Sequence, residues 1–191
     1  MAADDPAFGP PGDPSRHLAP TDLEAIFGRM PAAPRDAGRV VLIVRRGEDK
    51  VRETLERVVL ELDGGVPGDA WGRRPEPQRD QQLTVMQVDV ATALANGQPL
   101  TVFGDNLILD LDLSTENLPI GSRVRIGRVV LEVTPKAHNG CKKFAARFGK
   151  EALRFISTPA MRPRNFRGIF MCVVEPGEVA VGDTVAVLAR G

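Results

Sequence analysis

Short apolar runs, each bounded by glycine-containing turns, recur along this chain. Residues 40–44 form a β-branched run that is typical of a buried strand. Apolar and polar residues alternate on both sides of Gly127-Arg128, which is typical of a β-hairpin. The predicted strands are residues 40–44, 83–88, 168–179 and 181–188, together with a hairpin over residues 120–133.

Helical spacing of apolar residues is confined to a few short segments. Thr21 is a candidate N-cap with Glu24 three residues later, which predicts a short helix up to Phe27. A second helix is predicted at residues 89–95, and the segment from Phe144 onward has helix-like spacing. Residues 52–62 fit either a helix or a strand. Many short strands and few helices favour a mainly β fold, a strand-rich barrel with a few short helices.

The first part of the chain differs in composition from the rest. Residues 1–38 are rich in proline and glycine, and apart from the short helix we expect them to form an irregular extension. The β-rich pattern begins after them, so residues 39–191 are predicted to form the barrel domain. The chain of 191 residues is long enough for one domain with a sizeable core.

The charge balance restricts the class of partner. The chain carries 25 basic and 25 acidic residues, so no broad basic face is expected and nucleic acid is not an expected partner. No apolar run is long enough to span a membrane, and the acidic N-terminus lacks the order of a signal peptide. We expect a cytoplasmic protein without membrane contact. Its two cysteines should then be thiols rather than a disulfide framework.

One of these cysteines lies in an unusual segment. Cys141 follows a glycine, precedes two lysines and should lie near the N-terminus of the helix that includes Phe144. The helix dipole and the cations stabilise negative charge on sulfur, which favours a thiolate that acts as a nucleophile or a metal ligand. The alternative is a cysteine packed in the core, as most free cysteines are. We expect Cys172, which lies in an apolar run, to be packed in the core in this way.

Positive charge is concentrated around Cys141 although the whole chain is neutral. Between residues 136 and 167 the single acidic residue is Glu151. The basic residues of this interval are Lys136, Lys142, Lys143, Arg147, Lys150, Arg154, Arg162, Arg164 and Arg167. This concentration beside one thiol suggests an anionic ligand.

Several segments, in their order and spacing, resemble the MOSC domain, which is found at the C-terminus of molybdenum cofactor sulfurases and as small stand-alone bacterial proteins. The resemblance covers roughly residues 40–188 and is most specific from Phe103 onward. It rests on Phe103-Gly104-Asp105-Asn106-Leu107, residues 120–127 and 131–134, Gly140-Cys141-Lys142-Lys143-Phe144, residues 174–179 and Val181-Gly182-Asp183. Gly64-Gly65 with Gly68-Asp69 resembles an early loop of the family, but Trp71 stands where that loop often has a histidine.

The resemblance implies a barrel that holds the molybdenum cofactor, a pterin dithiolene with a phosphate. It also implies one cysteine that ligates molybdenum or carries sulfur, and Cys141 matches it; soft thiolate sulfur suits such a metal. His138, three residues earlier, is a candidate proton donor or hydrogen-bond partner of an oxo group, with a solvated loop histidine as the alternative. The candidate cofactor-binding residues are Asn106, Lys142, Lys143, Arg147, Arg164 and Arg167.

These six residues have alternatives of their own. The basic residues cannot all touch one cofactor, so some of them form a solvated helix face. Arg164 and Arg167 are the preferred phosphate ligands, because a guanidinium binds phosphate in a bidentate way. Asn106 binds the pterin or merely closes a turn.

Three functions are compatible with this sequence. The first is an oxidoreductase that reduces N-hydroxylated small molecules through a Cys141-ligated molybdenum, with electrons from a separate donor protein, because no flavin, haem or iron-sulfur motif is present. The second is a non-catalytic module that carries molybdenum cofactor or sulfur for a partner enzyme, which would also supply the sulfur. The third is a barrel that binds no cofactor.

Overall fold

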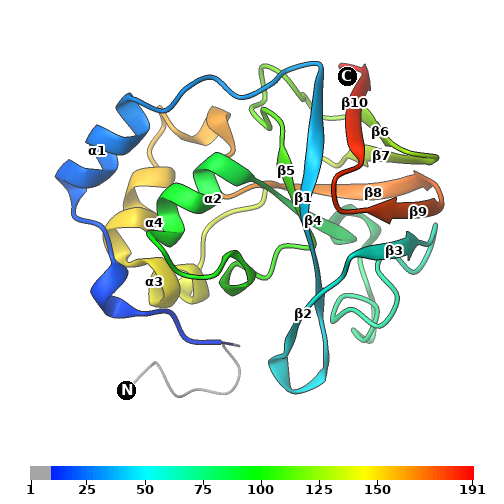
Figure 1. Cartoon of the computed structure of the whole chain (residues 1–191), viewed down its shortest axis with the longest axis horizontal. Helices are drawn as coiled ribbons and strands as arrows, with labels where there is room; N and C mark the ends of the chain where they lie inside the picture. The colour runs from blue at the N-terminus through cyan, green and yellow to red at the C-terminus, as the bar shows by residue number, and fades with distance from the viewer. Residues whose placement is uncertain (1–9) are drawn as a thin grey trace.

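The computed structural model describes residues 10–191 (Figure 1). Within them, runs of strands are separated by short helices. The strands are β1 (Ala37–Arg46), β2 (Arg52–Thr54), β3 (Arg57–Leu60), β4 (Leu83–Gln87), β5 (Leu107–Asp110), β6 (Arg123–Ile126), β7 (Val129–Val133), β8 (Ile169–Glu175), β9 (Gly177–Ala180) and β10 (Thr184–Ala189). The α-helices are α1 (Pro20–Gly28), α2 (Val88–Ala95), α3 (Lys142–Phe148) and α4 (Lys150–Ile156).

Seven strands close into a barrel. Their order is β10-β6-β7-β8-β4-β5-β1, and the pairing of β1 with β10 completes the ring. Neighbouring strands of the ring are antiparallel except β4 and β5, which are parallel. The long β1 continues past the ring and forms a hairpin with β2, while β3 and β9 form a separate two-stranded ribbon. The predicted mainly β barrel with a few short helices is therefore confirmed.

Two apolar cores lie on opposite faces of the barrel wall. Val85 and Leu107 point into the barrel and join its interior cluster, whereas their neighbours Met86 and Ile108 join a cluster beneath the helices. This division follows from the pleat, since successive side chains of a strand point to opposite faces. Figure 1 shows the four α-helices gathered on one side of the barrel, where they cover this outer face.

The described part of the N-terminal extension packs on the helical side. Leu23 and Phe27 of α1 are buried in the cluster beneath the helices. Nearer the N-terminus, the Pro10 carbonyl accepts a hydrogen bond from Arg147 Nε at 3.3 Å. The predicted boundary between residues 1–38 and 39–191 stays a prediction, and the first nine residues of that extension lie outside the described part.

Four local predictions are confirmed. β1 and β4 are the strands predicted at residues 40–44 and 83–88. α2 is the helix predicted at residues 89–95, and β6 with β7 forms the hairpin predicted over residues 120–133. Within residues 52–62, residues 52–54 form β2 and residues 57–60 form β3, so the strand alternative is the right one. The helix near Thr21 is present, but the predicted N-cap is wrong. Ala19 is the N-cap and Pro20 occupies the first turn, where a missing N–H costs nothing.

No helix within residues 10–191 has both the length and the apolar character needed to cross a membrane.

Candidate functional site

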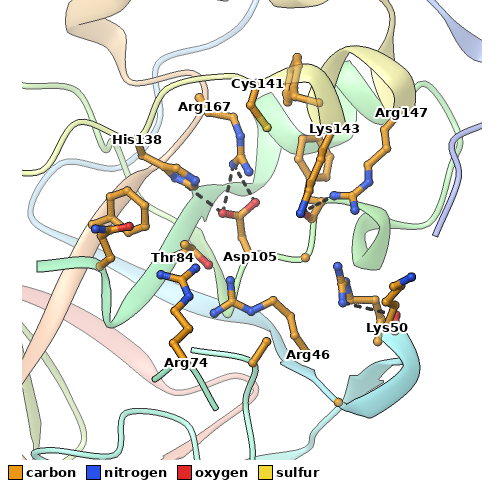
Figure 2. A pocket seen from close by; sticks show the side chains of 18 of the residues that line it. Arg46, Lys50, Arg74, Thr84, Asp105, His138, Cys141, Lys143, Arg147 and Arg167 are labelled. Carbon is orange, nitrogen blue, oxygen red and sulfur yellow. Dashed lines mark hydrogen bonds and ion pairs between the residues drawn. The ribbon is translucent and has the colours of Figure 1, made fainter. Parts of the chain in front are cut away.

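A cavity of about 660 Å³ opens where the β1–β2 hairpin, the loop before β5 and the start of α3 meet (Figure 2). The hairpin contributes residues 46–50 and Arg52, the loop contributes Phe103-Gly104-Asp105, and α3 contributes Lys143, Phe144, Arg147 and Phe148. The remaining walls are Ala70, Arg73, Arg74, Gln81, Thr84, His138, Cys141, Arg167 and Phe170. Segments far apart in the chain therefore share one concave surface, as ligand sites commonly do.

Positive charge dominates this cavity. Among the described residues that line it, eight are basic: Arg46, Lys50, Arg52, Arg73, Arg74, Lys143, Arg147 and Arg167. Three carry carboxylates, namely Glu48, Asp49 and Asp105. Walls with this excess of one charge attract ligands of the opposite sign.

Cys141 lies at the N-cap of α3 and is exposed to solvent. Its carbonyl accepts the amide of Ala145 at 3.0 Å, which is the first turn of the helix. The expected position of the sulfur near a helix N-terminus is thus confirmed, and Figure 2 shows the side chain beside Arg167 at the cavity. An accessible thiol bordered by cations has the surroundings expected of a reactive cysteine rather than a core residue.

Asp105 is the buried anion of the cavity wall. Its carboxylate is 1% exposed and accepts two hydrogen bonds from Arg167 Nη1, at 3.1 and 2.9 Å. His138 Nδ1 lies 3.8 Å from the same carboxylate, too far for a hydrogen bond. Arg167 is therefore the partner that compensates Asp105 (Figure 2).

The His138 imidazole is neutral. Burial, and then repulsion by Arg167 and Arg46, lower its pKa well below the ordinary 6.5. The ring packs against Phe170 with centroids 4.3 Å apart, and its buried Nδ1 has no hydrogen-bond partner among the described residues. A neutral imidazole with an unused ring nitrogen is able to exchange a proton or a hydrogen bond with a ligand.

The cations that line the cavity repel one another. Burial, with added repulsion from Arg52 and Arg167, lowers the pKa of Arg147 to about 10. Burial, followed by the charge of Arg46, also lowers the pKa of Arg52. A lowered arginine pKa means that the surroundings destabilise the charged guanidinium, and an anion bound in the cavity would stabilise it.

Glycine makes the position of Arg52 possible. Gly104 has φ +71°, and a Cβ there would lie 2.8 Å from Arg52 Nε. The backbone of the loop before β5 therefore approaches the guanidinium closely, and a side chain at position 104 would be strained in φ and would displace Arg52. This same Arg52 Nε, like Arg167 Nε, is buried without a hydrogen-bond partner among the described residues.

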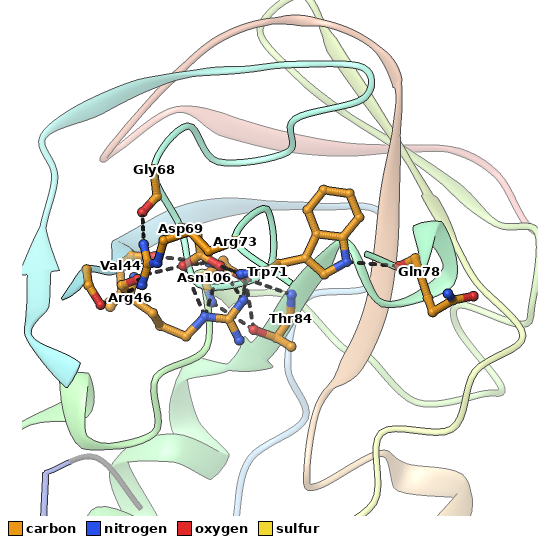
Figure 3. A network of polar contacts seen from close by, with 10 residues as sticks. Val44, Arg46, Gly68, Asp69, Trp71, Arg73, Gln78, Thr84 and Asn106 are labelled. Atoms are coloured by element: carbon orange, nitrogen blue, oxygen red, sulfur yellow. Dashed lines mark hydrogen bonds and ion pairs between the residues drawn. The ribbon is translucent and has the colours of Figure 1, made fainter. Parts of the chain in front are cut away.

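Arg46 is held in the wall by a buried network behind the cavity (Figure 3). Asp69 accepts from the Arg46 backbone amide at 2.8 Å and from its Nε at 3.0 Å, and Asn106 Oδ1 accepts from Arg46 Nη2 at 3.2 Å. Asn106 also accepts from the Thr84 amide and hydroxyl and donates to Asp69. Asp69 and Asn106 therefore orient a cation that faces the ligand space.

The cavity brings together five of the predicted site residues: Cys141, His138, Lys143, Arg147 and Arg167. It does not bring together the other three. Asn106 is fully buried in the network behind the wall, Lys142 is exposed on α3, and Arg164 is exposed with its guanidinium 4.9 Å above the Phe166 ring. Cys172 is buried in β8, in agreement with its assignment to the core.

Sequence reasoning missed the cations of the β1–β2 hairpin and the following loop. Arg46, Lys50, Arg52, Arg73 and Arg74 all lie outside the basic interval of residues 136–167. Asp105 was also missed, although it precedes Asn106 in the quoted motif. Trp71, the departure in the early loop, is buried and donates from its indole nitrogen to the Gln78 carbonyl at 2.9 Å.

The sequence model of the MOSC domain matches residues 79–186, more than half of the chain, and the chain therefore belongs to the MOSC domain family. This family is associated generally with molybdenum cofactor binding and is linked to molybdenum cofactor sulfurase-type proteins.

Solved structures share the fold. They include the YUAD protein from Bacillus subtilis (TM-score 0.63, 17% identity, 84% of this chain and 100% of that chain) and YiiM from Escherichia coli (TM-score 0.55, 20% identity, 80% and 71%). YiiM from Geobacillus stearothermophilus is similar as well (TM-score 0.52, 16% identity, 84% and 77%). A comparison with curated proteins finds no match.

The cavity residues fit an anionic cofactor. Arg52 Nε, Arg167 Nε and His138 Nδ1 are buried polar atoms with no hydrogen-bond partner in residues 10–191. All three side chains line the cavity. Unsatisfied buried groups of this kind are uncommon in folded proteins and are expected where a ligand supplies the partner.

Proposed function

We propose that this protein binds the molybdenum cofactor in the cavity and acts as an oxidoreductase that reduces N-hydroxylated small molecules. The observation that supports it most is the juxtaposition of one accessible thiol, Cys141, with an excess of cations that line the same cavity. A soft thiolate suits molybdenum, and guanidinium groups suit the phosphate of the pterin.

Cys141 and four arginines of the cavity have stated parts in this proposal. Cys141, as a thiolate, ligates the metal. Arg52, Arg147 and Arg167 neutralise the phosphate and the pterin, which also relieves their mutual repulsion. Arg46, held by Asp69, adds a fixed positive charge to the same wall. When bound, the cofactor supplies two-electron redox chemistry at the metal.

His138 is the proposed proton carrier. Its imidazole is neutral, so one ring nitrogen donates a proton and the other accepts one. Arg167, which pairs with Asp105, and Arg46 disfavour a charged ring, so a proton taken up by His138 is readily passed on. The neutral ring therefore accepts a proton from solvent at its free nitrogen, donates it to the oxygen that leaves the substrate, and returns to the neutral form.

The metal and the electrons come from outside the chain in this proposal. No group of three or more His, Cys, Asp or Glu side chains within residues 10–191 is arranged to hold a metal ion, so a metal at Cys141 needs the ligands of the cofactor itself. Electrons come from a separate donor protein, and we place the pair in the cytoplasm, where Cys141 and Cys172 stay reduced.

The test uses protein made in a host that synthesises the cofactor. We expect bound molybdenum and reduction of an N-hydroxylated substrate with an added donor. Cys141→Ala should lose both metal and activity, whereas Cys172→Ala, which lies outside the cavity, should keep them. Equal metal content and activity in Cys141→Ala would refute the proposal.

The exposure of Cys141 also favours a second function, because an accessible sulfur can be delivered to a partner. In that case the chain carries molybdenum cofactor or sulfur for another enzyme. If the protein binds the cofactor but reduces no substrate with any electron donor tested, the carrier function is favoured over the reductase. Absence of cofactor from protein made in the competent host would refute both.

A further inference from the structure

A second cavity, of about 520 Å³, adjoins the first. His138 and Arg167 line both cavities, so these two side chains stand between them. The remaining wall comes from the loop residues Ala137, Asn139 and Gly140, from Ile156 and Ser157 at the end of α4, and from Arg162, Asn165 and Phe166. The proposed cofactor site does not include this cavity.

The lining has a distinct chemical character. Among the described residues around it, Arg162 and Arg167 are cationic and none carries a carboxylate. Ile156 and Phe166 contribute apolar surface to the same walls. A space with cations and an apolar surface matches a molecule that has an anionic group on an apolar body.

Arg162 is oriented by the chain around it. Its Nε donates to the Ser157 carbonyl at 3.0 Å, and its two terminal nitrogens have no protein partner within residues 10–191. Asn165 fixes the adjacent turn with φ +51° and a hydrogen bond from Nδ2 to the Leu113 carbonyl at 2.8 Å. The free edge of the guanidinium is therefore available to a carboxylate or a phosphate.

Arg167 extends this charge to the first cavity. One of its terminal nitrogens bonds Asp105, while its buried Nε lacks a partner among the described residues. A molecule in the second cavity that contacts Arg162 thus lies next to the wall formed by Arg167 and His138. The two cavities are arranged so that one elongated ligand could touch both.

We propose that the second cavity binds an anionic oxygen group, a carboxylate or a phosphate, carried on the apolar body of the substrate. The identity of this molecule as the substrate rests on the reductase function proposed above, whereas the binding of an anion in the second cavity is independent of that function. Arg162 is its principal ligand, and the apolar body packs on Ile156 and Phe166.

Binding is tested on the purified full chain with three probes: benzoate, phenyl phosphate and uncharged benzyl alcohol. The amide signals of Ser157 and Ile156 report the second cavity, and those of Ala70 and Gly104 report the first. We expect benzoate or phenyl phosphate to shift the Ser157 and Ile156 signals to saturation. Whichever of the two binds more tightly identifies the anion.

Two variants separate the proposed ligand from general surface charge. Arg162→Ala should weaken this binding about tenfold or more, the usual loss for a charge-assisted hydrogen bond. Arg154→Ala, an exposed arginine of α4 that lines neither cavity, should leave it unchanged. Equal affinity in the two variants, an equal response to benzyl alcohol, or shifts confined to Ala70 and Gly104 would overturn the proposal.

Turnover tests the link to the substrate. With carboxylate-bearing and neutral N-hydroxylated substrates of equal size, Arg162→Ala should raise KM about tenfold for the first alone, with kcat unchanged. Equal KM changes for both substrates would contradict the assignment of the substrate. A chain without reductase activity that still binds benzoate through Arg162 would refute the proposed function and support the anion site.

Discussion

Replacement of Asp69 by asparagine tests the network that orients Arg46. Asp69 is 2% exposed and accepts hydrogen bonds from the backbone amide and Nε of Arg46, the Trp71 amide and Asn106 Nδ2. Asparagine has nearly the same shape but no charge, and its amide nitrogen cannot accept. Asp69→Asn therefore leaves the buried Arg46 charge uncompensated beside Arg52.

The expected loss follows from this geometry. Removal of one partner from a buried ion pair costs about 3–5 kcal/mol, against a total unfolding free energy of about 5–15 kcal/mol for a typical domain. For a chain of this size each kcal/mol corresponds to about 2–4 °C in Tm, so Tm should fall by roughly 6–20 °C. Asp63→Asn is the matched control, because Asp63 is 94% exposed and pairs with Arg79 at 3.7 Å. It should change stability by less than about 1 kcal/mol.

Thermal and urea unfolding of the unmodified protein, Asp69→Asn and Asp63→Asn measure these losses of stability. The pH dependence of the stability provides a second measurement. Burial raises the pKa of Asp69, but the hydrogen bonds and charge of Arg46 outweigh it, and the net shift is below the ordinary 3.8. The pair therefore stabilises the fold above about pH 4, and this contribution is lost as the pH falls through the lowered pKa. The gap between Asp69→Asn and the unmodified protein should narrow on acidification. Equal stability of the two Asn variants at pH 7 would refute the argument.

Two further predictions concern His138 and Gly168. In an NMR titration, with His17→Gln used to assign the signals, His138 should remain neutral at pH 6.5 because burial and nearby arginines lower its pKa. Arg167→Gln should raise the pKa of His138, since it removes one of these charges. A pKa of His138 near 6.5 in the unmodified protein would contradict the burial argument. Gly168 and Gly182 both have positive φ, but a Cβ at Gly168 would collide with the Val85 carbonyl, whereas one at Gly182 meets nothing within 4 Å. Gly168→Ala should thus lower Tm clearly more than Gly182→Ala, and equal losses would show that strain in φ alone matters.

The parts of the fold that depend on local pattern were accessible from the sequence. The alternation around Gly127-Arg128 identified the β6–β7 hairpin, and the apolar spacing at residues 89–95 identified α2. The pairing of β4 with β5 was not accessible, because a parallel ladder joins strands separated by a helix and a long loop. Residues 107–110 are also too short to give a clear strand pattern.

The candidate site shows the same limit. Cys141 and Arg167 lie in one basic interval of the sequence and His138 lies three residues before Cys141, so local sequence pointed to all three. Arg46 and Arg52 reach the cavity only because β1 extends beyond the barrel as a hairpin, which no local pattern reveals. Asp105 and Asn106 are adjacent, yet the first lines the cavity and the second is buried behind it. Which neighbour faces a ligand depends on the direction of the backbone, not on the residue type.

The most direct test of the proposed function is the X-ray absorption spectrum of molybdenum in the purified protein and in Cys141→Ser. We expect molybdenum in both proteins and one sulfur ligand fewer in the variant, because the serine oxygen replaces the only sulfur that residues 10–191 contribute to the cavity. Identical sulfur coordination in both proteins, or no molybdenum in protein from a host that makes the cofactor, would contradict it.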